Sequence, residues 1–600
     1  MIRPGRPGTA ATLFVGGAVA FVAGVQIVRA VRPALLMDPD PAWIPARFLL
    51  WVGVLAGTAS AGGLAAGLFF LWIRSRFFPE VLRPLPLRRP AIVLVAAAAL
   101  VLGTLLRFIA LERIPPSLWI DDLSLIPAAL ELKGNLSDFQ DSIRPAPYGV
   151  LKPYGSVGVL YLELFRGSLR AFGTTVFGVR FLSAAAGALS LVTAMLVARA
   201  LLPAGGGALA ALVLAGLRWN LVMSRWGWNA IVLAPFADVA ALLLIQSRRR
   251  KSLLLGMASG LVAGLCAHLY LAAWIVAAAL LAFAIWPEET RGTALFRLRL
   301  ALVFVASFAV AASPLFLFRK PGGSPYFARA SDHNVLREVH YMRSPLPAFL
   351  AAADALAAPW FKSDPFDHHD LPGKTRLGWI LGIPVAVALS RALVRPREPF
   401  SGFLLCHAAA GFCAAVAGGH AGIPNGYRFV YLSNVTAVAA SGGILALLEL
   451  APPARRRAAV LAALGLVAIS GAVGARDALL RWPERPETFG GFFGHDTLLG
   501  RAVARWERFG SVSVDPGVGH AQITFETVRR YRLDPDGAKL APPAVGGEIS
   551  LRAFRVTLPG GPPRAGERRV ERVGDAWGRE WGWVYGVRVS DPAVKAPANF

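Results

Sequence analysis

Cysteine and charged side chains are both scarce in this 600-residue sequence, and each scarcity excludes a class of protein. The three cysteines, Cys266, Cys406 and Cys413, all lie inside apolar runs, and their spacing matches neither a disulfide framework nor a metal site. Charged residues make up 16% of the chain and hydrophobic ones 55%, which is too apolar for a soluble globular protein. No internal repeat is visible, so a transporter built from inverted repeats has no direct support.

Acidic residues are also few, 36 against 62 basic ones, and the formal net charge is +26. Such a balance is common in proteins that bind nucleic acid. Here, however, many of the arginines stand in short clusters between apolar runs, and no basic stretch is interleaved with aromatic residues in a polar segment. This placement is typical of the cytoplasmic loops of a membrane protein, and the sequence predicts no nucleic-acid partner.

Long apolar runs are what the sequence has in abundance, and a run of about 18 or more residues can cross a hydrocarbon core about 30 Å thick. The first run is long for a signal peptide and lacks a clear cleavage site, so we expect it to be retained as a span. The sequence predicts an α-helical polytopic membrane protein with about thirteen transmembrane helices, at 9–28, 47–73, 90–111, 177–201, 204–223, 229–246, 252–268, 270–286, 300–318, 375–394, 401–419, 428–450 and 458–475.

Basic clusters give the predicted orientation, because such clusters mark the cytoplasmic loops. They follow the second, sixth, eighth and twelfth predicted spans, at 74–89, 248–251, 291–299 and 455–457. All four lie on one side if the N-terminus is cytoplasmic and the stretch 252–286 contains a turn near Leu269. The sequence therefore predicts a multi-pass protein of the cytoplasmic membrane with its C-terminus outside.

Three long segments then lie outside the membrane: the loops 112–176 and 319–374 and the tail 476–600. We expect two additional helices in 1–89, a catalytic core in 90–475, and a small extracytoplasmic α/β domain in 476–600. The tail contains strand-like stretches at 511–514, 549–556 and 583–589, a helical stretch at 521–531, and a loop rich in proline and glycine.

Two adjacent carboxylates, Asp121 and Asp122, stand a few residues beyond the third predicted span. Pro115 and Pro116 prevent the span from continuing, and Trp119 is a natural anchor at the membrane surface. Two interpretations stay open from the residue types alone. Asp122 can cap a helix that begins at the next residue, or the carboxylates can act chemically beside the bilayer, where acidic groups need a partner or a task.

The run 114–122 (Ile-Pro-Pro-Ser-Leu-Trp-Ile-Asp-Asp) resembles the P-x-G-L-W-x-D-E signature that follows the first core span of GT-C glycosyltransferases. More narrowly, it is similar to the protein O-mannosyltransferase and ArnT-like branch, glycosyltransferase family 39. Later stretches resemble further family elements in the same order, at 180–184, 224–229, 260–270 and 367–373. The resemblance covers about 90–475. It departs at Asp122, where the family has glutamate, and in the first two spans, which have no counterpart.

This resemblance implies an inverting glycosyltransferase that moves a sugar from a polyprenyl-phosphate-linked donor to an acceptor hydroxyl on a protein, lipid or glycan. The reaction would take place at the outer face of the membrane, with Asp121 as the general base and Asp122 as a cap, a cation ligand or a tuning charge. The alternative is a lipid or glycan transporter (flippase), and a third is a non-catalytic scaffold. The acidic residues lie almost entirely in loops, which favours chemistry at the surface.

A donor phosphate requires cations. Arginine or lysine close by stabilises the negative charge of the phosphate as it leaves. Alternatively, such side chains extend toward lipid headgroups. The candidates are Arg225 in a predicted short outer turn, Arg144 and Lys152 in the first outer loop, and Arg428 at a span boundary. We also expect Trp119, His268 and Tyr270 to line the cavity, with a hydrogen-bonded interfacial pair as the alternative for His268 and Tyr270.

A further hypothesis is a divalent metal ion in the second outer loop, held by His333 and His368. Asp332, His340, His369 and Asp370 lie in or beside the same loop. No spacing among them matches a known ligand pattern, and solvated loop histidines are the alternative. The sequence predicts no cofactor with certainty.

Overall fold

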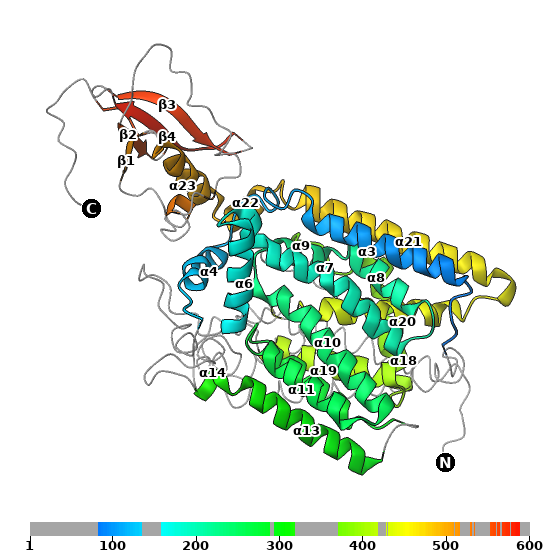
Figure 1. Ribbon diagram of the computed structural model, residues 1–600. Coiled ribbons are helices and arrows are strands. Elements are labelled where there is room, and N and C mark those ends of the chain that lie inside the picture. The colour runs from blue at the N-terminus through cyan, green and yellow to red at the C-terminus, as the bar shows by residue number, and fades with distance from the viewer. Residues whose placement is uncertain are drawn as a thin grey trace, which may run out of the picture.

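The computed structural model shows a bundle of helices with a small sheet beyond one end (Figure 1). It describes residues 82–134, 158–288, 293–317, 370–417, 428, 430–508, 510–515, 528–530, 533, 553–557, 559, 561–564, 567–575 and 578–587. The predicted spans 9–28 and 47–73 lie outside these residues.

Every predicted span within the described residues contains a helix. The helices are α3 (Arg89–Phe108), α4 (Ile120–Leu130), α6 (Val159–Phe172), α7 (Val176–Leu201), α8 (Gly206–Gly216), α9 (Arg218–Arg225), α10 (Asn229–Arg250), α11 (Leu253–Cys266), α12 (Ala273–Ile285), α13 (Ala294–Ala312), α14 (Pro314–Leu317), α18 (Gly378–Val394), α19 (Pro399–Ala417), α20 (Leu432–Leu448), α21 (Arg456–Arg476), α22 (Pro486–Gly491) and α23 (Gly494–Trp506). A π-helical turn, Asp477–Arg481, extends α21.

Among the described residues, five helices are long and apolar enough to cross a membrane, or up to seven if each of two bent pairs is one span. The helical, multi-span class is therefore confirmed, while the count of about thirteen and the orientation stay predictions. The bent pairs are α8 with α9, at 59°, and α18 with α19, at 109°. The first bend corrects the continuous span expected at 204–223. Leu217 there has an extended backbone, immediately before the polar residues Arg218 and Asn220.

Two further features agree with the predicted arrangement of the spans. Between α11 and α12 the chain turns at 267–272, around the expected position of Leu269. At another point, two basic clusters assigned to the same side meet on one carboxylate. Glu449 pairs with Arg456 at 2.6 Å and lies 3.6 Å from Arg83.

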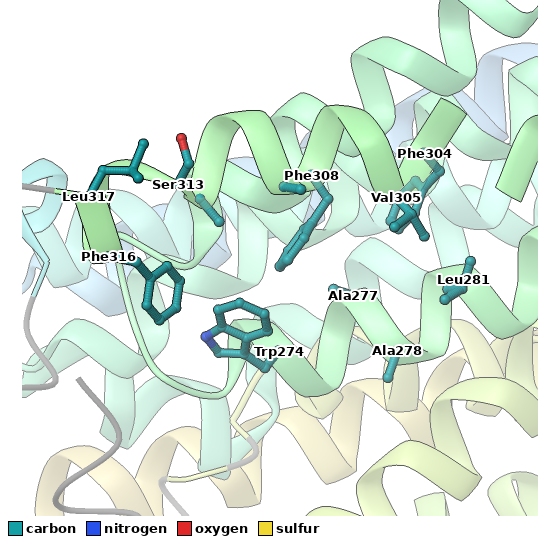
Figure 2. Close-up of a pocket in the computed structure, with 12 residues that line it drawn as sticks. Trp274, Ala277, Ala278, Leu281, Phe304, Val305, Phe308, Ser313, Phe316 and Leu317 are labelled. Atoms are coloured by element: carbon teal, nitrogen blue, oxygen red, sulfur yellow. The ribbon is translucent and has the colours of Figure 1, made fainter. Parts of the chain in front are cut away.

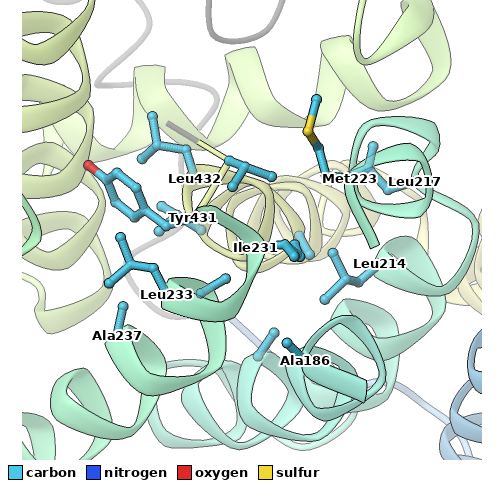
Figure 3. Packing of buried hydrophobic residues seen from close by; sticks show 14 of the residues in the cluster. Ala186, Leu214, Leu217, Met223, Ile231, Leu233, Ala237, Tyr431 and Leu432 are labelled. Atoms are coloured by element: carbon cyan, nitrogen blue, oxygen red, sulfur yellow. The ribbon is translucent and has the colours of Figure 1, made fainter. Parts of the chain in front are cut away.

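The centre of the bundle is packed from α7, α8, α9, α10 and α20 (Figure 3). Ala186, Leu214, Ile231, Leu233 and Leu432 are all nearly or fully buried there. Between helices in lipid, close van der Waals packing replaces the hydrophobic driving force, so small residues at the contacts matter.

Glycines bring α8 and α21 into direct backbone contact beside the bend at Leu217. A Cβ added at Gly474 would lie 2.1 Å from the Gly216 carbonyl oxygen, and one added at Gly216 would lie 2.2 Å from the Gly471 Cα. No other residue type fits at this distance, so the C-terminal half of α21 is held against the bent span by its glycines.

The tail contains a sheet of four strands in the order β1-β2-β4-β3, namely β1 (Ser511–Val514), β2 (Ala553–Thr557), β3 (Glu567–Gly574) and β4 (Glu580–Val587). β1 pairs with β2 in parallel, and the other pairs are antiparallel. Leu499, Val503 and Trp506 of α23 pack on one face, against Phe554, Val556, Val573 and Val584. Strands β1, β2 and β4 overlap the predicted stretches. Charge-rich β3 and helix α23 were not expected.

We predict that Gly474→Ala destabilises the protein by about 1–3 kcal/mol, because the new methyl group forces α8 and α21 apart. Gly465→Ala is the matched control on the same helix, since a Cβ there meets no atom within 4 Å. Thermal melting of both purified variants in one detergent measures the difference. Equal melting temperatures would show that the glycine contact does not matter.

Candidate active site

The acidic segment lies in the first turn of α4. This helix begins at Ile120, with Trp119 as an N-cap residue that makes no side-chain capping hydrogen bond. Asp121 and Asp122 are therefore inside the helix, and the expectation that Asp122 caps a helix beginning at the next residue is wrong. Carboxylates in a first turn are favoured by the helix dipole. The Asp121 side chain lies outside the described part of the structure.

Asp122 is almost fully buried, with 1% of the residue exposed. Its carboxylate faces the turn between α9 and α10, where a Cβ added at Gly227 would lie 3.3 Å from the Asp122 Cγ. The Tyr161 hydroxyl of α6 donates to the Gly227 carbonyl oxygen at 3.1 Å. Burial, and next the Asp122 charge, raise the pKa of Tyr161, which keeps its phenol protonated as a donor. These contacts position one carboxylate between α4, α6 and the 226–228 turn.

Buried arginines position the chain that leads into the acidic segment. Arg180 of α7 donates to the carbonyls of Leu111, at 2.8 Å, and Ser117. Arg225 donates to the carbonyls of Leu106, Arg107 and Ile109, at 2.9, 3.2 and 2.6 Å. The last carbonyls of a helix have no partner within the helix, so Arg225 supplies one for the end of α3.

This position corrects the expectation that Arg225 lies in a short outer turn. Arg225 is inside α9 and fully buried, because its guanidinium is bound by the carbonyls at the end of α3. Its role as a ligand of the donor phosphate stays a prediction. What the contacts show is that Arg225 and Arg180 fix the start of the segment that carries Asp121 and Asp122.

Aromatic residues of the tail cover the acidic segment. The Trp119 ring lies 5.8 Å from Trp226 and 5.5 Å from Phe493, measured between ring centroids. Phe492 lies 5.8 Å from Trp226 and 5.7 Å from Trp482. These contacts were not predicted, since nothing in the composition of the tail reveals which surface it covers.

One polar contact adds to this aromatic cover. The hydroxyls of Ser117, two residues before Trp119, and Thr497 of α23 are 2.5 Å apart, and both residues are buried. The first turn of α23 is thus attached to the loop that precedes the acidic segment. The start of the tail is part of the site.

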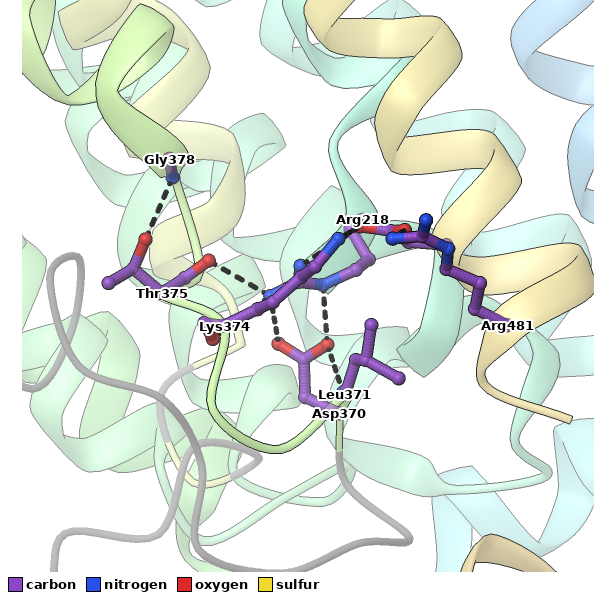
Figure 4. Close-up of polar contacts among 8 residues, drawn as sticks. Arg218, Asp370, Leu371, Lys374, Thr375, Gly378 and Arg481 are labelled. Carbon is purple, nitrogen blue, oxygen red and sulfur yellow. Dashed lines mark hydrogen bonds and ion pairs between the residues drawn. The ribbon is translucent and has the colours of Figure 1, made fainter. Parts of the chain in front are cut away.

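A buried ion cluster joins α9, the segment that precedes α18 and the π-helical turn after α21 (Figure 4). The Arg218 Nε donates to Asp370 at 2.7 Å, and its Nη1 lies 3.5 Å from Asp477. Lys374 pairs with Asp477 at 2.6 Å, and Arg481 approaches it at 3.5 Å. Arg218 and both carboxylates are buried, whereas Lys374 and Arg481 are 36% and 46% exposed.

Asp370 belongs to the stretch 367–373 that the sequence analysis singled out, but its ionic partners were missed. A signal was present, because Arg218 interrupts a predicted span and a charge there requires a partner. The cluster ends one residue before Trp482, so it adjoins the aromatic cover of the acidic segment. Its part-exposed cations Lys374 and Arg481 are additional candidates for an anionic ligand.

An apolar cavity of about 520 Å³ lies between α12, α13 and α14 (Figure 2). Rings of Trp274, Phe304, Phe308 and Phe316 line it, together with small aliphatic side chains and Ser313. Neither Trp119, His268 nor Tyr270 is among its lining residues. The His268 Nε2 instead lies 2.9 Å from the Ala311 carbonyl oxygen, and Tyr270 is buried.

The remaining predicted site residues lie at the limits of the described chain. The described residues do not include Arg144, Lys152, His333 and His368. Arg428 is described and is half-buried. Among the residues that are described, no three His, Cys, Asp or Glu side chains are grouped so that they could hold a metal ion. The metal hypothesis for the second outer loop therefore stays a prediction.

No family model and no curated protein matches the sequence. Solved structures with a similar arrangement include the apo oligosaccharyltransferase of Archaeoglobus fulgidus, 14% identical over 74% of this chain, with a TM-score of 0.49. This chain spans 64% of that protein's length. Another is ArnT from Cupriavidus metallidurans bound to undecaprenyl phosphate, 15% identical over 84% of this chain and 99% of that one, with a TM-score of 0.44.

We predict that Asp370→Asn destabilises the protein by about 3–5 kcal/mol, because it leaves the buried Arg218 charge without one of its two carboxylates. Arg481→Gln is the matched control in the same cluster. It removes a cation that is 46% exposed and 3.5 Å from Asp477, so we expect a change below about 1 kcal/mol. The melting temperatures of the two variants in detergent measure the difference. A larger loss in the control would contradict a stabilising role for the buried Arg218–Asp370 pair.

Proposed function

We propose that the protein is an inverting glycosyltransferase that moves a sugar from a polyprenyl-phosphate-linked donor to an acceptor hydroxyl at the outer face of the cytoplasmic membrane. The observation that carries the proposal is the confinement of the acidic segment. Asp121 and Asp122 occupy the first turn of α4, between the end of an apolar span and the aromatic residues of the tail. The motif resemblance supplies the reaction class and the donor class.

Asp121 is the proposed general base. The acceptor oxygen attacks the anomeric carbon of the donor while its proton passes to the Asp121 carboxylate. The bond between the anomeric carbon and the phosphate oxygen breaks on the opposite side, so the configuration inverts and polyprenyl phosphate leaves. A positioned base contributes roughly 10²–10⁴-fold, and holding donor and acceptor in line adds to this. Asp122, being buried, is the proposed partner that tunes the local charge.

The donor has an apolar tail and an anionic head, and the structure offers a place for each. The cavity of about 520 Å³ between α12 and α13 suits part of an isoprenoid chain, because its lining is almost entirely aromatic and aliphatic. Candidates for the phosphate are Arg225, Arg144, Lys152 and Arg428, and we add Lys374 and Arg481 because both are partly exposed. The proposed acceptor is a hydroxyl on a protein, lipid or glycan.

A second candidate function, a lipid or glycan transporter, is favoured by one observation. A buried polar chain crosses the bundle: Arg107 donates to the Asn220 Oδ1 at 2.6 Å, and the Asn220 and Asn434 amides are 3.5 Å apart. Asn434 donates to Asp238 at 2.7 Å, and Thr193 does so at 2.8 Å. Ionisable groups inside a bundle often line a transport path.

We predict that Asp121→Asn lowers sugar transfer by about 10²–10⁴-fold while thermal melting stays unchanged, because the amide cannot accept the proton. The measurement is transfer of a labelled sugar from a polyprenyl-phosphate carrier to an acceptor mixture, on membranes that contain each variant. Asp238→Asn is the matched control, since it changes the only acid of the polar chain described above.

The outcomes separate the two functions. Wild-type transfer by Asp121→Asn would remove Asp121 from the role of base. The transporter would be established instead if the protein moves the carrier between leaflets and transfers no sugar. Asp238→Asn should then abolish this movement, and Asp121→Asn should not.

A further inference from the structure

The face of the tail sheet that lies opposite α23 carries a row of arginine and aromatic side chains. Arg555 of β2, Tyr585 of β4 and Arg569 of β3 are direct cross-strand partners, and Thr557 and Arg572 flank Trp583 in the next row. Arg555, Tyr585 and Thr557 are buried, so the side chains of this row that reach the surface are Arg569, Arg572 and the half-buried Trp583. Phe554, Val556 and Val584 point to the other face, where α23 packs. The sheet stands beyond the bundle, with α23 between them (Figure 1), so this face is turned away from the helices.

Ion pairs neutralise most of the cations in this row. Arg555 forms a bidentate pair with Glu567, at 2.7 and 2.6 Å, and also contacts Asp515. Arg572 lies 3.6 Å from Glu580, and Arg564 lies 3.4 Å from Asp515. The Glu567 carboxylate has a lowered pKa, first because Arg555 donates to it, and stays charged at neutral pH.

Arg569 differs from its neighbours, since no carboxylate pairs with it within the described part of the tail. Its guanidinium carbon lies 4.5 Å from the centroid of the Trp583 ring and 5.9 Å from that of Tyr585. Its Nε donates to the Tyr585 hydroxyl at 3.2 Å. Stacking and this hydrogen bond hold the group in one orientation, while the side chain is exposed. The two terminal nitrogens then form a preorganised fork, the geometry that binds a carboxylate or phosphate through two parallel hydrogen bonds.

We infer that this row binds an anionic saccharide. The acidic group lies on the Arg569 fork, and the sugar packs against the accessible parts of Trp583 and Arg572. The acceptor role of that saccharide rests on the proposed function; the binding itself does not. An acidic peptide fits the row less well. It would bind by adding a strand at the edge, yet β3 has register shifts between Arg569 and Glu571 and between Val573 and Gly574. Such bulges interrupt the ladder that an added strand requires.

The test is direct binding of a galacturonic acid oligomer to the full-length protein in detergent, with a neutral galactose oligomer of equal length as the comparison. We expect saturable binding of the acidic oligomer alone. Arg569→Gln should weaken it about tenfold or more, since a hydrogen-bonded charge is lost. Arg569→Lys should weaken it too, because lysine keeps the charge and loses the fork. Arg568→Gln is the matched control: it removes an exposed charge from the same strand on the opposite face.

Several outcomes would overturn the inference. These are equal loss with Arg568→Gln and Arg569→Gln, equal binding of the neutral oligomer, competition by polyglutamate at equal affinity, and full binding by Arg569→Lys. Unchanged melting of the Arg569 variants confirms that the sheet is intact. Asp121→Asn should bind the oligomer as the unaltered protein does, so failure of sugar transfer and failure of saccharide binding are seen separately.

Discussion

The structure depends on buried guanidiniums that bind backbone carbonyls at the C-terminal end of α3. Arg225 satisfies the carbonyls of residues 106, 107 and 109, and Arg180 holds those of 111 and 117. Each of these carbonyls lies at or beyond a helix end, where no intrahelical partner exists. Because the arginines extend from α9 and α7, the turn that leads to the acidic segment is fixed by the bundle and not by its own sequence alone.

The bend at Leu217 follows from the same constraint. Beyond it, α9 carries Arg218 at its first position and Arg225 at its last, seven residues apart, which is about 10 Å along a helix. One end therefore reaches the carboxylates Asp370 and Asp477, and the other reaches the end of α3. A straight continuation of α8 would change the direction of both side chains. The glycine contact between Gly216 and Gly474 places α21, and with it Asp477, beside the bend.

The sequence predicted the helical, multi-span class because span length is set by the bilayer, a constraint that apolar runs display directly. It also located the acidic segment, since two prolines after a span leave little choice of structure. It failed for Arg225 because a Ser-Arg-Trp-Gly-Trp stretch has the composition of an exposed turn, and only tertiary contacts bury it. The tail contacts at Trp119 and the pairing of Arg218 with Asp370 join residues more than 150 positions apart, and no local pattern encodes such pairings.

The tail and the bundle are joined by a short, well-packed connection. Asp477 takes part in the ion cluster, Trp482 and Phe492 extend the aromatic contact toward Trp226, and Thr497 reaches Ser117. The stretch from Asp477 to Thr497 thus carries contacts to three different parts of the core. A domain attached in this way has a defined position over the acidic segment, whereas one on a flexible linker does not. A ligand bound to the face of the sheet opposite α23 is consequently held at a fixed distance from Asp121 and Asp122.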